Sequence, residues 1–402
     1  MIATAPAQRA PLLYLCLENP WRLSAGGLIR NYWMIRTLAE RFEVELVTAG
    51  DSADPVPEDF AALCGAIRCF PALTKAARIM RALLPGSTLY TAGGVSRAMR
   101  DAVAALLARR QYAAIVLDLA MVDALPADCT VPIVYNAHNC EATLLERRAA
   151  KERSFARRVA TAVDARRLRP IEARLIERAA LVAACSPDDV EDLADLSPRA
   201  RRSAVVVPNG VDGERYAEVT QSAAVPGTVL VTGSFDWHPN RLGLRWFLRE
   251  VVPVLRPQVD AESVRIRIAG RMSAALAAEV DAVPLVSAAP NVPDMRTELA
   301  LAEIVVAPIV ASSGTRLRIL EAWAAGRPVV TTPEGAFGLP HADGDDLIVR
   351  SGAAPFARAV AELLRDPARR LALRRRGLER AREHDWRRIG RTLLDACERA
   401  RF

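Results

Sequence analysis

The chain has 402 residues, more than a single hydrophobic core usually serves, so we expect two domains of roughly 200 residues each. Its formal net charge of +7 favours anionic partners. However, all but two of its 54 basic residues are arginine, which indicates a coding bias as much as selected chemistry, and we expect no nucleic-acid partner. The seven cysteines lack a Cys-x-x-Cys pair, and the chain has neither a signal-like start nor a long apolar segment. These features predict a reduced, cytoplasmic protein that does not span a membrane.

Short apolar runs, each followed by a helical pattern, recur along the first half of the chain. They lie at residues 12–17, 44–48, 114–119, 133–137, 181–185 and 205–207. Such alternation is typical of a parallel sheet. An Arg-rich stretch at residues 146–178, broken by Pro170, has the composition of a basic helical stripe that contacts an anionic lipid surface; the alternative is a solvated helical face.

The same pattern starts again in the second half, at residues 229–233, 266–270, 304–307, 329–332 and 347–349. Two helices are predicted after it, at residues 356–380 and 386–401. We therefore predict an α/β protein with two doubly wound Rossmann-like domains. The expected boundaries are 1–204 for the N-terminal domain, 205–227 for a linker, 228–385 for the C-terminal domain and 386–402 for a final helix.

Residues 312–332 combine a Ser/Gly turn, a short helix and a strand. Gly326 fits the position just past a helix end and Pro328 forbids continuation, so a helix is predicted over about residues 315–325. Glu321 then lies roughly 10 Å along the axis from Gly314. The helix start can bind a diphosphate through its N–H groups while Glu321 meets a ribose diol, which predicts a nucleotide-sugar clamp. The alternative is an ordinary capped helix before a buried strand.

The sequence Gly-Thr-Arg-Leu-Arg-Ile-Leu-Glu-Ala at residues 314–322 resembles the donor motif of the glycosyltransferase family 4-like enzymes. It is similar to the variant branch that reads Gly-Thr-Arg-Leu-Lys-x-Leu-Glu-Ala. Glu321 matches the second acid of the family motif, Ser313 stands in place of the first acid, and Arg318 replaces the lysine. Further similar tracts lie at residues 26–30, 135–141, 185–188, 207–212 and 233–240. The resemblance implies the GT-B fold, in which two Rossmann-like domains face each other across a cleft and the last helix packs back on the N-terminal domain.

The resemblance implies that a nucleoside diphosphate sugar lies in this cleft, held chiefly by the C-terminal domain. The residues expected to bind it are Gly26, Gly27, Gly233, Ser234, Asn240, Gly314, Thr315, Arg316, Arg318 and Glu321. The family commonly places Arg and Lys in the first loop of the second domain, where this chain has Ser234 and Pro239. The diphosphate charge must then be neutralised elsewhere, and Arg316 and Arg318 are the first candidates, with Arg241 and Arg271 in reserve.

In the N-terminal domain, Gly26 and Gly27 let the backbone approach a ligand at a helix start, although a tight strand-to-helix turn explains them equally. His138 follows a strand, where open α/β sheets bind ligands, and is expected to hydrogen-bond the transferred sugar. A structural histidine is the alternative. Asn139 and Glu141 are further candidates, on the acceptor side or in support of the site. The expected catalytic residues are His138, Arg316 and Glu321.

No metal or other cofactor is expected, because Asp343-Gly-Asp345 lies in a Gly/Asp-rich turn and is better explained as turn chemistry than as a metal ligand pair. The resemblance implies a retaining hexosyltransferase that acts on a hydroxyl of a glycan, lipid-linked or small-molecule acceptor. A cell-envelope or exopolysaccharide intermediate at the inner face of the cytoplasmic membrane is expected. The alternatives are a GT-B nucleotide-sugar epimerase and a non-catalytic GT-B binding protein.

Overall fold

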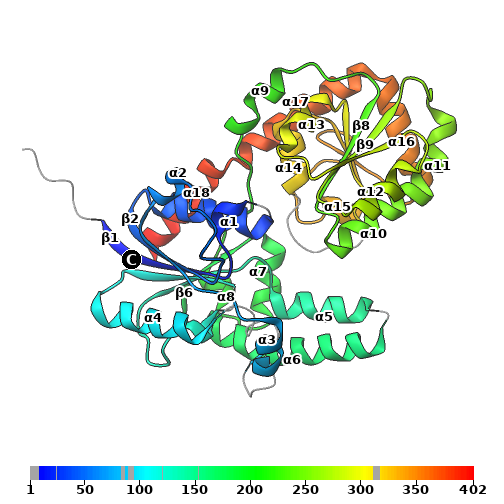
Figure 1. Cartoon of the computed structure of the whole chain (residues 1–402). Coiled ribbons are helices and arrows are strands. Elements are labelled where there is room, and N and C mark those ends of the chain that lie inside the picture. Colours follow the sequence, from blue (N-terminus) through cyan, green and yellow to red (C-terminus); the bar gives the residue numbers. More distant parts are fainter. Residues whose placement is uncertain are drawn as a thin grey trace, which may run out of the picture. The chain divides into compact units, whose positions relative to one another are not determined.

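The computed structural model describes residues 9–23, 25–82, 87–88, 95–119, 121–152, 154–310 and 317–402. The chain forms two compact units, Met1–Pro208 with Arg387–Phe402, and Asn209–Trp386. Each unit contains one parallel sheet covered by helices (Figure 1). The prediction of two Rossmann-like doubly wound domains is confirmed.

The sheet of the first unit has seven strands in the order β3-β2-β1-β4-β5-β6-β7. Its strands are β1 (Ala10–Cys16), β2 (Phe42–Thr48), β3 (Cys64–Cys69), β4 (Ala114–Asp118), β5 (Ile133–Asn136), β6 (Ala179–Ala184) and β7 (Ala204–Val206). Strands β1 and β2 pair in parallel from Ala10 opposite Phe42 to Cys16 opposite Thr48. The strand order reverses beside β1, so the carboxyl ends of β1 and β4 flank a switch point, where open sheets bind ligands.

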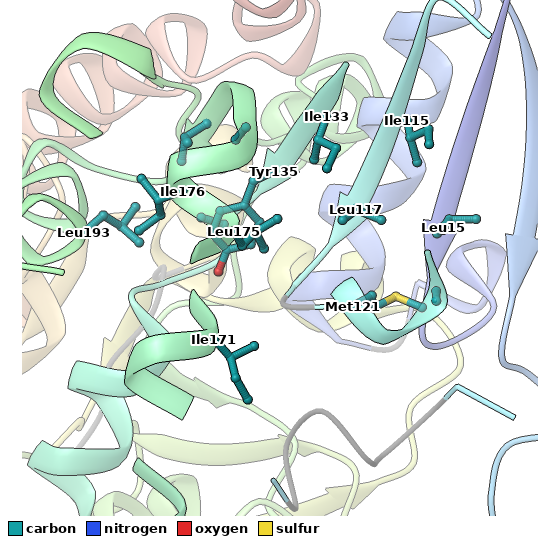
Figure 2. Packing of buried hydrophobic residues seen from close by; sticks show 14 of the residues in the cluster. Leu15, Ile115, Leu117, Met121, Ile133, Tyr135, Ile171, Leu175, Ile176 and Leu193 are labelled. Carbon is teal, nitrogen blue, oxygen red and sulfur yellow. The ribbon is translucent and has the colours of Figure 1, made fainter. Parts of the chain in front are cut away.

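Helices cover both faces of this sheet. They are α1 (Gly26–Leu38), α2 (Glu58–Ala61), α3 (Lys75–Ala82), α4 (Arg97–Arg109), α5 (Glu141–Lys151), α6 (Phe155–Arg178), α7 (Pro187–Ala194), α8 (Ala200–Ser203) and α18 (Trp386–Arg399). Because strand side chains alternate, Leu13 and Leu15 share one face with Ile115, where α4, α6 and α7 cover them (Figure 2). On the other side, α18 packs so closely on α1 that a Cβ at Gly390 would lie 2.6 Å from Thr37 Oγ1.

The sheet of the second unit has six strands in the order β10-β9-β8-β11-β12-β13. Its strands are β8 (Thr228–Thr232), β9 (Arg265–Gly270), β10 (Val286–Pro290), β11 (Ile304–Ala307), β12 (Val329–Thr331) and β13 (Ile348–Val349). The strand order reverses between β8 and β11. Their carboxyl ends therefore flank a second switch point.

Alternate residues of β8 again face different helices. The helices of this unit are α9 (Ala217–Gln221), α10 (His238–Trp246), α11 (Val252–Leu255), α12 (Ala274–Asp281), α13 (Met295–Leu301), α14 (Leu317–Ala324), α15 (Pro333–Ala336), α16 (Ala353–Arg365) and α17 (Pro367–Glu383). Val229 and Val231 pack against α10, α11, α12 and α16, whereas Leu230 packs against the face covered by α9, α13 and α14.

Three sequence-based predictions about elements are wrong. The linker predicted at residues 205–227 is not a separate segment, because Tyr216 and Val219 are buried in the core of the second unit. The helix predicted at residues 356–380 is two helices, since Asp366 caps α17 by accepting a hydrogen bond from the Arg369 N–H at 2.9 Å and Pro367 begins it. Pro170 does not break α6, whose apolar residues on both sides of the proline are buried in the core.

The described helices were also compared with the length and hydropathy that a lipid bilayer requires. Within those residues, none is long and apolar enough to cross a membrane.

Candidate active site

In the second unit, the loop after β8, the helix α10 and the helix α14 bring four predicted residues together at the switch point. Arg318 donates from Nη2 to Asn240 Oδ1 at 2.9 Å, and Asn240 donates from Nδ2 to the Ser234 carbonyl at 2.8 Å. A Cβ at Gly233 would lie 3.3 Å from Arg318 Nη2, so the glycine leaves room for the guanidinium. Gly233, Ser234, Asn240 and Arg318 therefore form one cluster at the carboxyl end of β8.

A second cation, Arg271, reaches the same loop from the end of β9. Its Nη2 and Nε lie 3.1 and 3.3 Å from Ser234 Oγ, and its side chain is 54% exposed, so it can turn toward a ligand. Gly270 has φ of +138°, and a Cβ there would lie 1.9 Å from the Gly233 carbonyl oxygen. The other reserve candidate, Arg241, instead donates to the carbonyls of Phe235 and Asp236 at 3.1 and 2.8 Å and so fixes the loop.

Glu321 lies one turn after Arg318 on α14, on the same side of the helix. The Tyr216 hydroxyl hydrogen-bonds its carboxylate. Burial raises the pKa of Glu321, and the Tyr216 hydrogen bond and the charge of Arg318 oppose this rise. Burial conversely lowers the pKa of Arg318, and the charge of Glu321 opposes that change.

The end of α14 has the geometry that the sequence predicts. Gly326 has φ of +65°, its N–H binds the Trp323 carbonyl at 2.9 Å, and the Arg327 N–H binds the Ala322 carbonyl at 2.8 Å. These two bonds are those of a Schellman motif, which fixes the last turn of the helix. Residues 311–316, which include the predicted Gly314, Thr315 and Arg316, lie outside the described residues.

In the first unit, His138 belongs to the loop after β5, and its side chain lies beside the start of α1. A Cβ at Gly27 would lie 2.9 Å from His138 Cε1 and 3.0 Å from His138 Nδ1, so the glycine leaves room for the imidazole. His138 Nε2 lies 2.6 Å from Asp118 Oδ1 at the buried end of β4. Asn136 Nδ2 lies 3.2 Å from the same nitrogen, so the imidazole is held through Nε2 while Nδ1 lies beside the start of α1. Gly26, as predicted, is the first residue of that helix.

A buried polar network holds this region in place. Arg30 is fully buried and donates to Asn136 Oδ1 at 2.7 Å, to the Val207 carbonyl at 2.6 Å and to the Ala183 carbonyl at 3.1 Å. Asn136 in turn donates to Asn31 Oδ1 at 2.9 Å. These bonds tie α1 to the carboxyl ends of β5, β6 and β7, and so position the backbone on both sides of His138.

The start of α5 is capped by a residue far away in sequence. Glu172 of α6 accepts from the Glu141 N–H at 3.0 Å and from the Ala142 N–H at 2.9 Å, and the Tyr135 hydroxyl donates to it at 2.7 Å. Asn139 donates to Glu141 at 3.3 Å. The predicted acceptor-side residues Asn139 and Glu141 therefore contact each other directly.

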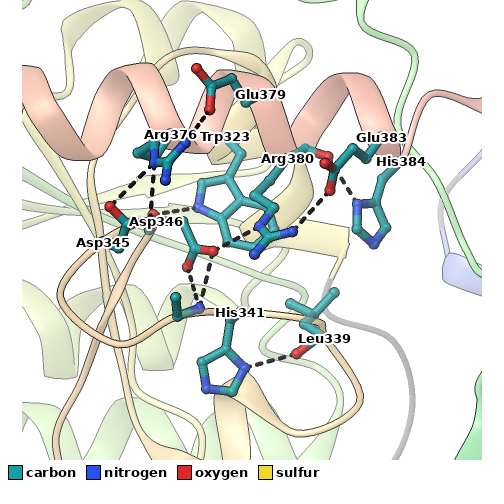
Figure 3. A network of polar contacts seen from close by, with 11 residues as sticks. Trp323, Leu339, His341, Asp345, Asp346, Arg376, Glu379, Arg380, Glu383 and His384 are labelled. Carbon is teal, nitrogen blue, oxygen red and sulfur yellow. Dashed lines mark hydrogen bonds and ion pairs between the residues drawn. The ribbon is translucent and has the colours of Figure 1, made fainter.

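The Asp-x-Asp sequence belongs to a network of ion pairs with α17 and with Arg350, the residue after β13. Asp343 pairs with Arg350 at 2.9 Å. Asp345 pairs with Arg376 at 3.0 Å, and the neighbouring Asp346 is buried and pairs with Arg380 at 2.8 Å (Figure 3). Among the described residues, no group of three or more His, Cys, Asp or Glu side chains is arranged to hold a metal ion.

Sequence reasoning did not assign roles to four residues that shape these clusters. They are Arg30, Asp118, Glu172 and Tyr216. Asp118 had a detectable signal, because an acidic residue ended a buried strand next to the switch point. The contacts of Arg30, Glu172 and Tyr216 join residues distant in sequence and had no local signal.

The chain was compared with known protein families. Residues 30–215 match the family described as Glycosyltransferase Family 4, and residues 226–366 match the family described as Glycosyl transferases group 1. A phosphatidyl-myo-inositol mannosyltransferase of Mycobacterium leprae (strain TN) is 29% identical over 196 residues, which are 46% of this chain and 50% of the relative. The chain thus spans about half the length of this curated relative.

Solved structures resemble the whole fold. Sucrose-phosphate synthase from Thermosynechococcus elongatus has a TM-score of 0.67 and 16% identity, with 97% of this chain and 99% of that chain covered. HepE from Anabaena, in complex with UDP-glucose, has a TM-score of 0.64 and 14% identity, with 97% of this chain and 100% of that chain covered. At these identities the similarity establishes the fold.

Proposed function

Because the chain belongs to the family 4-like glycosyltransferases with the GT-B fold, we propose that it transfers a sugar from a nucleoside diphosphate sugar to a hydroxyl acceptor. The observation that carries this proposal is the cluster at the carboxyl end of β8. There Arg318 and Arg271 are positioned on the Ser234 loop, and Glu321 lies one turn further along α14.

The chemistry of this cluster suits the donor. Guanidinium groups bind phosphate oxygens through charge-assisted hydrogen bonds, and a carboxylate accepts hydrogen bonds from a ribose diol. Tyr216 holds one part of the Glu321 carboxylate, while its remaining lone pairs can accept ribose hydroxyls. HepE, which has a similar fold, binds UDP-glucose, which supports a nucleotide sugar as donor.

For the chemical step, we propose retention of the anomeric configuration by front-face attack. The bond between the anomeric carbon and the diphosphate oxygen breaks, the acceptor oxygen bonds to the same face, and the leaving phosphate takes the acceptor's hydroxyl proton. Arg318, Arg271 and, as the sequence predicts, Arg316 stabilise the charge on the diphosphate. As the sequence predicts, His138 hydrogen-bonds the transferred sugar. NMR of the product linkage tests the stereochemistry, and an inverted anomer would exclude this mechanism.

Calorimetry with UDP, GDP and ADP tests the donor assignment. We expect one of the three to bind and thereby to identify the base. Failure of all three would favour a non-catalytic binding protein. Turnover of the nucleotide sugar without any acceptor, detected by NMR as a changed sugar, would instead favour an epimerase.

For the acceptor, we propose a lipid-linked hydroxyl at an anionic membrane surface in cell-envelope or exopolysaccharide synthesis. The matched relative is named for mannose transfer to a phosphatidyl-inositol. On α6, Phe155, Val159 and Val163 are 71%, 44% and 47% exposed and lie four residues apart, so they form one apolar stripe. Arg158 lies over the Phe155 ring at 5.4 Å. An apolar stripe beside arginines suits a lipid headgroup region.

Sedimentation with liposomes tests this surface. The protein is expected to bind vesicles that contain phosphatidylglycerol, less strongly as salt rises, and not vesicles of phosphatidylcholine alone. Val159→Glu should abolish binding, whereas the control Leu371→Glu, at a residue of α17 that is 58% exposed, should not. Absence of binding at low salt would favour a soluble acceptor.

A further inference from the structure

A pocket of about 220 Å³ lies at the amino ends of strands in the second sheet. The Ser234 loop lies at the opposite, carboxyl ends. The pocket is lined by residues that lead into the amino ends of strands, namely Ser222–Ala224 before β8, Glu303 before β11 and Gly326–Pro328 before β12, and by residues of α17. One liquid water occupies about 30 Å³, so the pocket has room for several waters or for a phosphate group with a small substituent.

Three arginines line this pocket. Arg327 is only 4% exposed, and its Nη2 donates to the carbonyls of Val219, Ser222 and Ala300 at 3.1, 3.2 and 3.0 Å. Its Nε is buried and has no hydrogen-bond partner in the described part of the chain. A buried N–H without a partner is costly, and this one belongs to a residue that lines the pocket.

The other two arginines add positive charge. Arg374 donates to the Thr220 carbonyl, and its Nε would lie 3.1 Å from a Cβ at Gly326. Arg370 pairs with Glu303 at 2.7 Å, and the other oxygen of Glu303 accepts from the Gly227 N–H at 2.7 Å. The single carboxylate of the pocket is therefore fully engaged.

Two formal positive charges remain without a carboxylate partner among the described residues, those of Arg327 and Arg374. Burial, together with the nearby charge of Arg374, lowers the pKa of Arg327 to about 10. The folded chain therefore pays to hold these like charges together. An anion that lies in the pocket beside them would reduce their repulsion.

We infer that this pocket binds a phosphate group, either as free phosphate or as part of a small phosphate ester, between Arg327, Arg370 and Arg374. The site is separate from the donor cluster, because the pocket lies at the amino ends of the strands and the donor cluster lies at their carboxyl ends. The inference goes beyond the proposed function, and binding can be measured without any sugar transfer.

Scanning calorimetry of the full chain tests the inference. Sodium phosphate, and separately glycerol 3-phosphate, is added at constant ionic strength adjusted with sodium chloride. Both are expected to raise the Tm with a saturating concentration dependence, since a ligand that binds only the folded state stabilises it. Tighter binding of the ester would identify a phosphate ester as the natural ligand, and equal binding would identify free phosphate.

Matched variants locate the site. Arg374→Gln should weaken phosphate binding by about tenfold or more, whereas Arg375→Gln removes the same charge from an exposed position of the same helix and should leave it unchanged. Ala223→Glu adds a carboxylate at an exposed residue of the pocket; it should raise the Tm without ligand and abolish the phosphate effect.

The variant Arg271→Gln tests whether phosphate binds at the donor cluster instead of in this pocket. Loss of the phosphate effect in Arg271→Gln with retention in Arg374→Gln would overturn the inference. So would equal effects of Arg374→Gln and Arg375→Gln, or an Ala223→Glu variant that still responds fully to phosphate.

Discussion

Glu321 is the residue from which the donor proposal gives the clearest energetic expectation. Glu321→Ala should weaken binding of the preferred nucleoside diphosphate by roughly 1.5–3 kcal/mol, because a charged acceptor of the ribose hydroxyls is lost. Tyr216→Phe should weaken it less, since the carboxylate stays but is no longer held by the hydroxyl. Calorimetry measures both. Glu362→Ala, on α16 with a side chain 50% exposed, is the control, and equal effects of the control and Glu321→Ala would contradict the assignment.

His138 should affect the rate of sugar transfer but not the binding of the nucleotide, in contrast to Glu321. His138→Ala is expected to leave the affinity for the free nucleoside diphosphate unchanged, because that ligand lacks the sugar. It should lower kcat/KM by about tenfold to a hundredfold, the loss of one hydrogen bond to a polar group in a buried site. Asp118→Asn should have a smaller effect of the same kind, since Asp118 only orients the imidazole through Nε2. A fall in nucleotide affinity in His138→Ala would indicate a structural histidine.

Among individual residues, the sequence could identify those at element ends but not their partners. His138 and Glu321 were accessible because strand ends and helix positions follow from apolar runs, glycine and proline. Asp118 and Tyr216 contact them only after β4 is placed next to β5 and after residues 209–221 pack on α14. Those placements depend on sheet order, which local patterns do not contain.

At the scale of elements, the cap of α5 by Glu172 can be tested by stability. Both carboxylate oxygens accept hydrogen bonds, so Glu172→Gln would turn an amide NH2 toward an N–H donor and should lower the free energy of unfolding by about 1–3 kcal/mol. Urea unfolding followed by circular dichroism measures this change. The control Arg174→Gln removes the exposed hydrogen bond from Arg174 Nε to the Pro170 carbonyl on the same helix, and should lower the free energy of unfolding by less.

The difference in free energy of unfolding between the unchanged chain and Glu172→Gln should also depend on pH. Burial raises the pKa of Glu172 above its unfolded value, which is about 4.3. The folded chain therefore binds more protons than the unfolded chain as pH rises from that value to the folded pKa, and this group's stabilisation falls across the window. Glu172→Gln lacks this titration. The difference in free energy of unfolding between the unchanged chain and the variant should therefore narrow as pH rises from the unfolded to the folded pKa of Glu172. A difference that widens would show that the hydrogen bonds to the ionised form outweigh burial.

The elements that sequence reasoning missed have a common physical property. Strands β3 and β10 were not predicted, and each is one of the two outer strands of its sheet; the outer strands at the other edges, β7 and β13, were predicted. The residues of β3 and β10 are mostly half-exposed, so neither forms the continuous apolar run that marks a strand buried on both faces. The central strands β1, β4, β8 and β11 are buried and were all predicted. Sequence pattern thus gave the centre of each sheet, which is also where the switch points lie.

At the scale of the whole molecule, the fold could be predicted because the strand–helix alternation occurs twice and each repeat has its own core. The division of the chain was harder to predict, since apolar residues decide it in three dimensions. Tyr216 and Val219 join the second core although they follow a proline- and glycine-containing stretch. Arg387–Phe402 belongs to the first unit although it is last in sequence, which the family resemblance implied and the local pattern did not.

The last prediction concerns metal dependence of the complete reaction. The proposed donor site neutralises the diphosphate with Arg271 and Arg318, and Asp343 and Asp345 each pair with an arginine instead. Sugar transfer should therefore continue at an essentially unchanged rate in excess EDTA, measured as product formed over time. Asp343→Asn should retain that rate as well, and should change the free energy of unfolding by only about 0–1 kcal/mol, because the pair with Arg350 is partly exposed. Loss of activity in EDTA with recovery on adding Mn²⁺, together with loss in Asp343→Asn, would show that this turn binds a catalytic metal and that the arginines do not suffice.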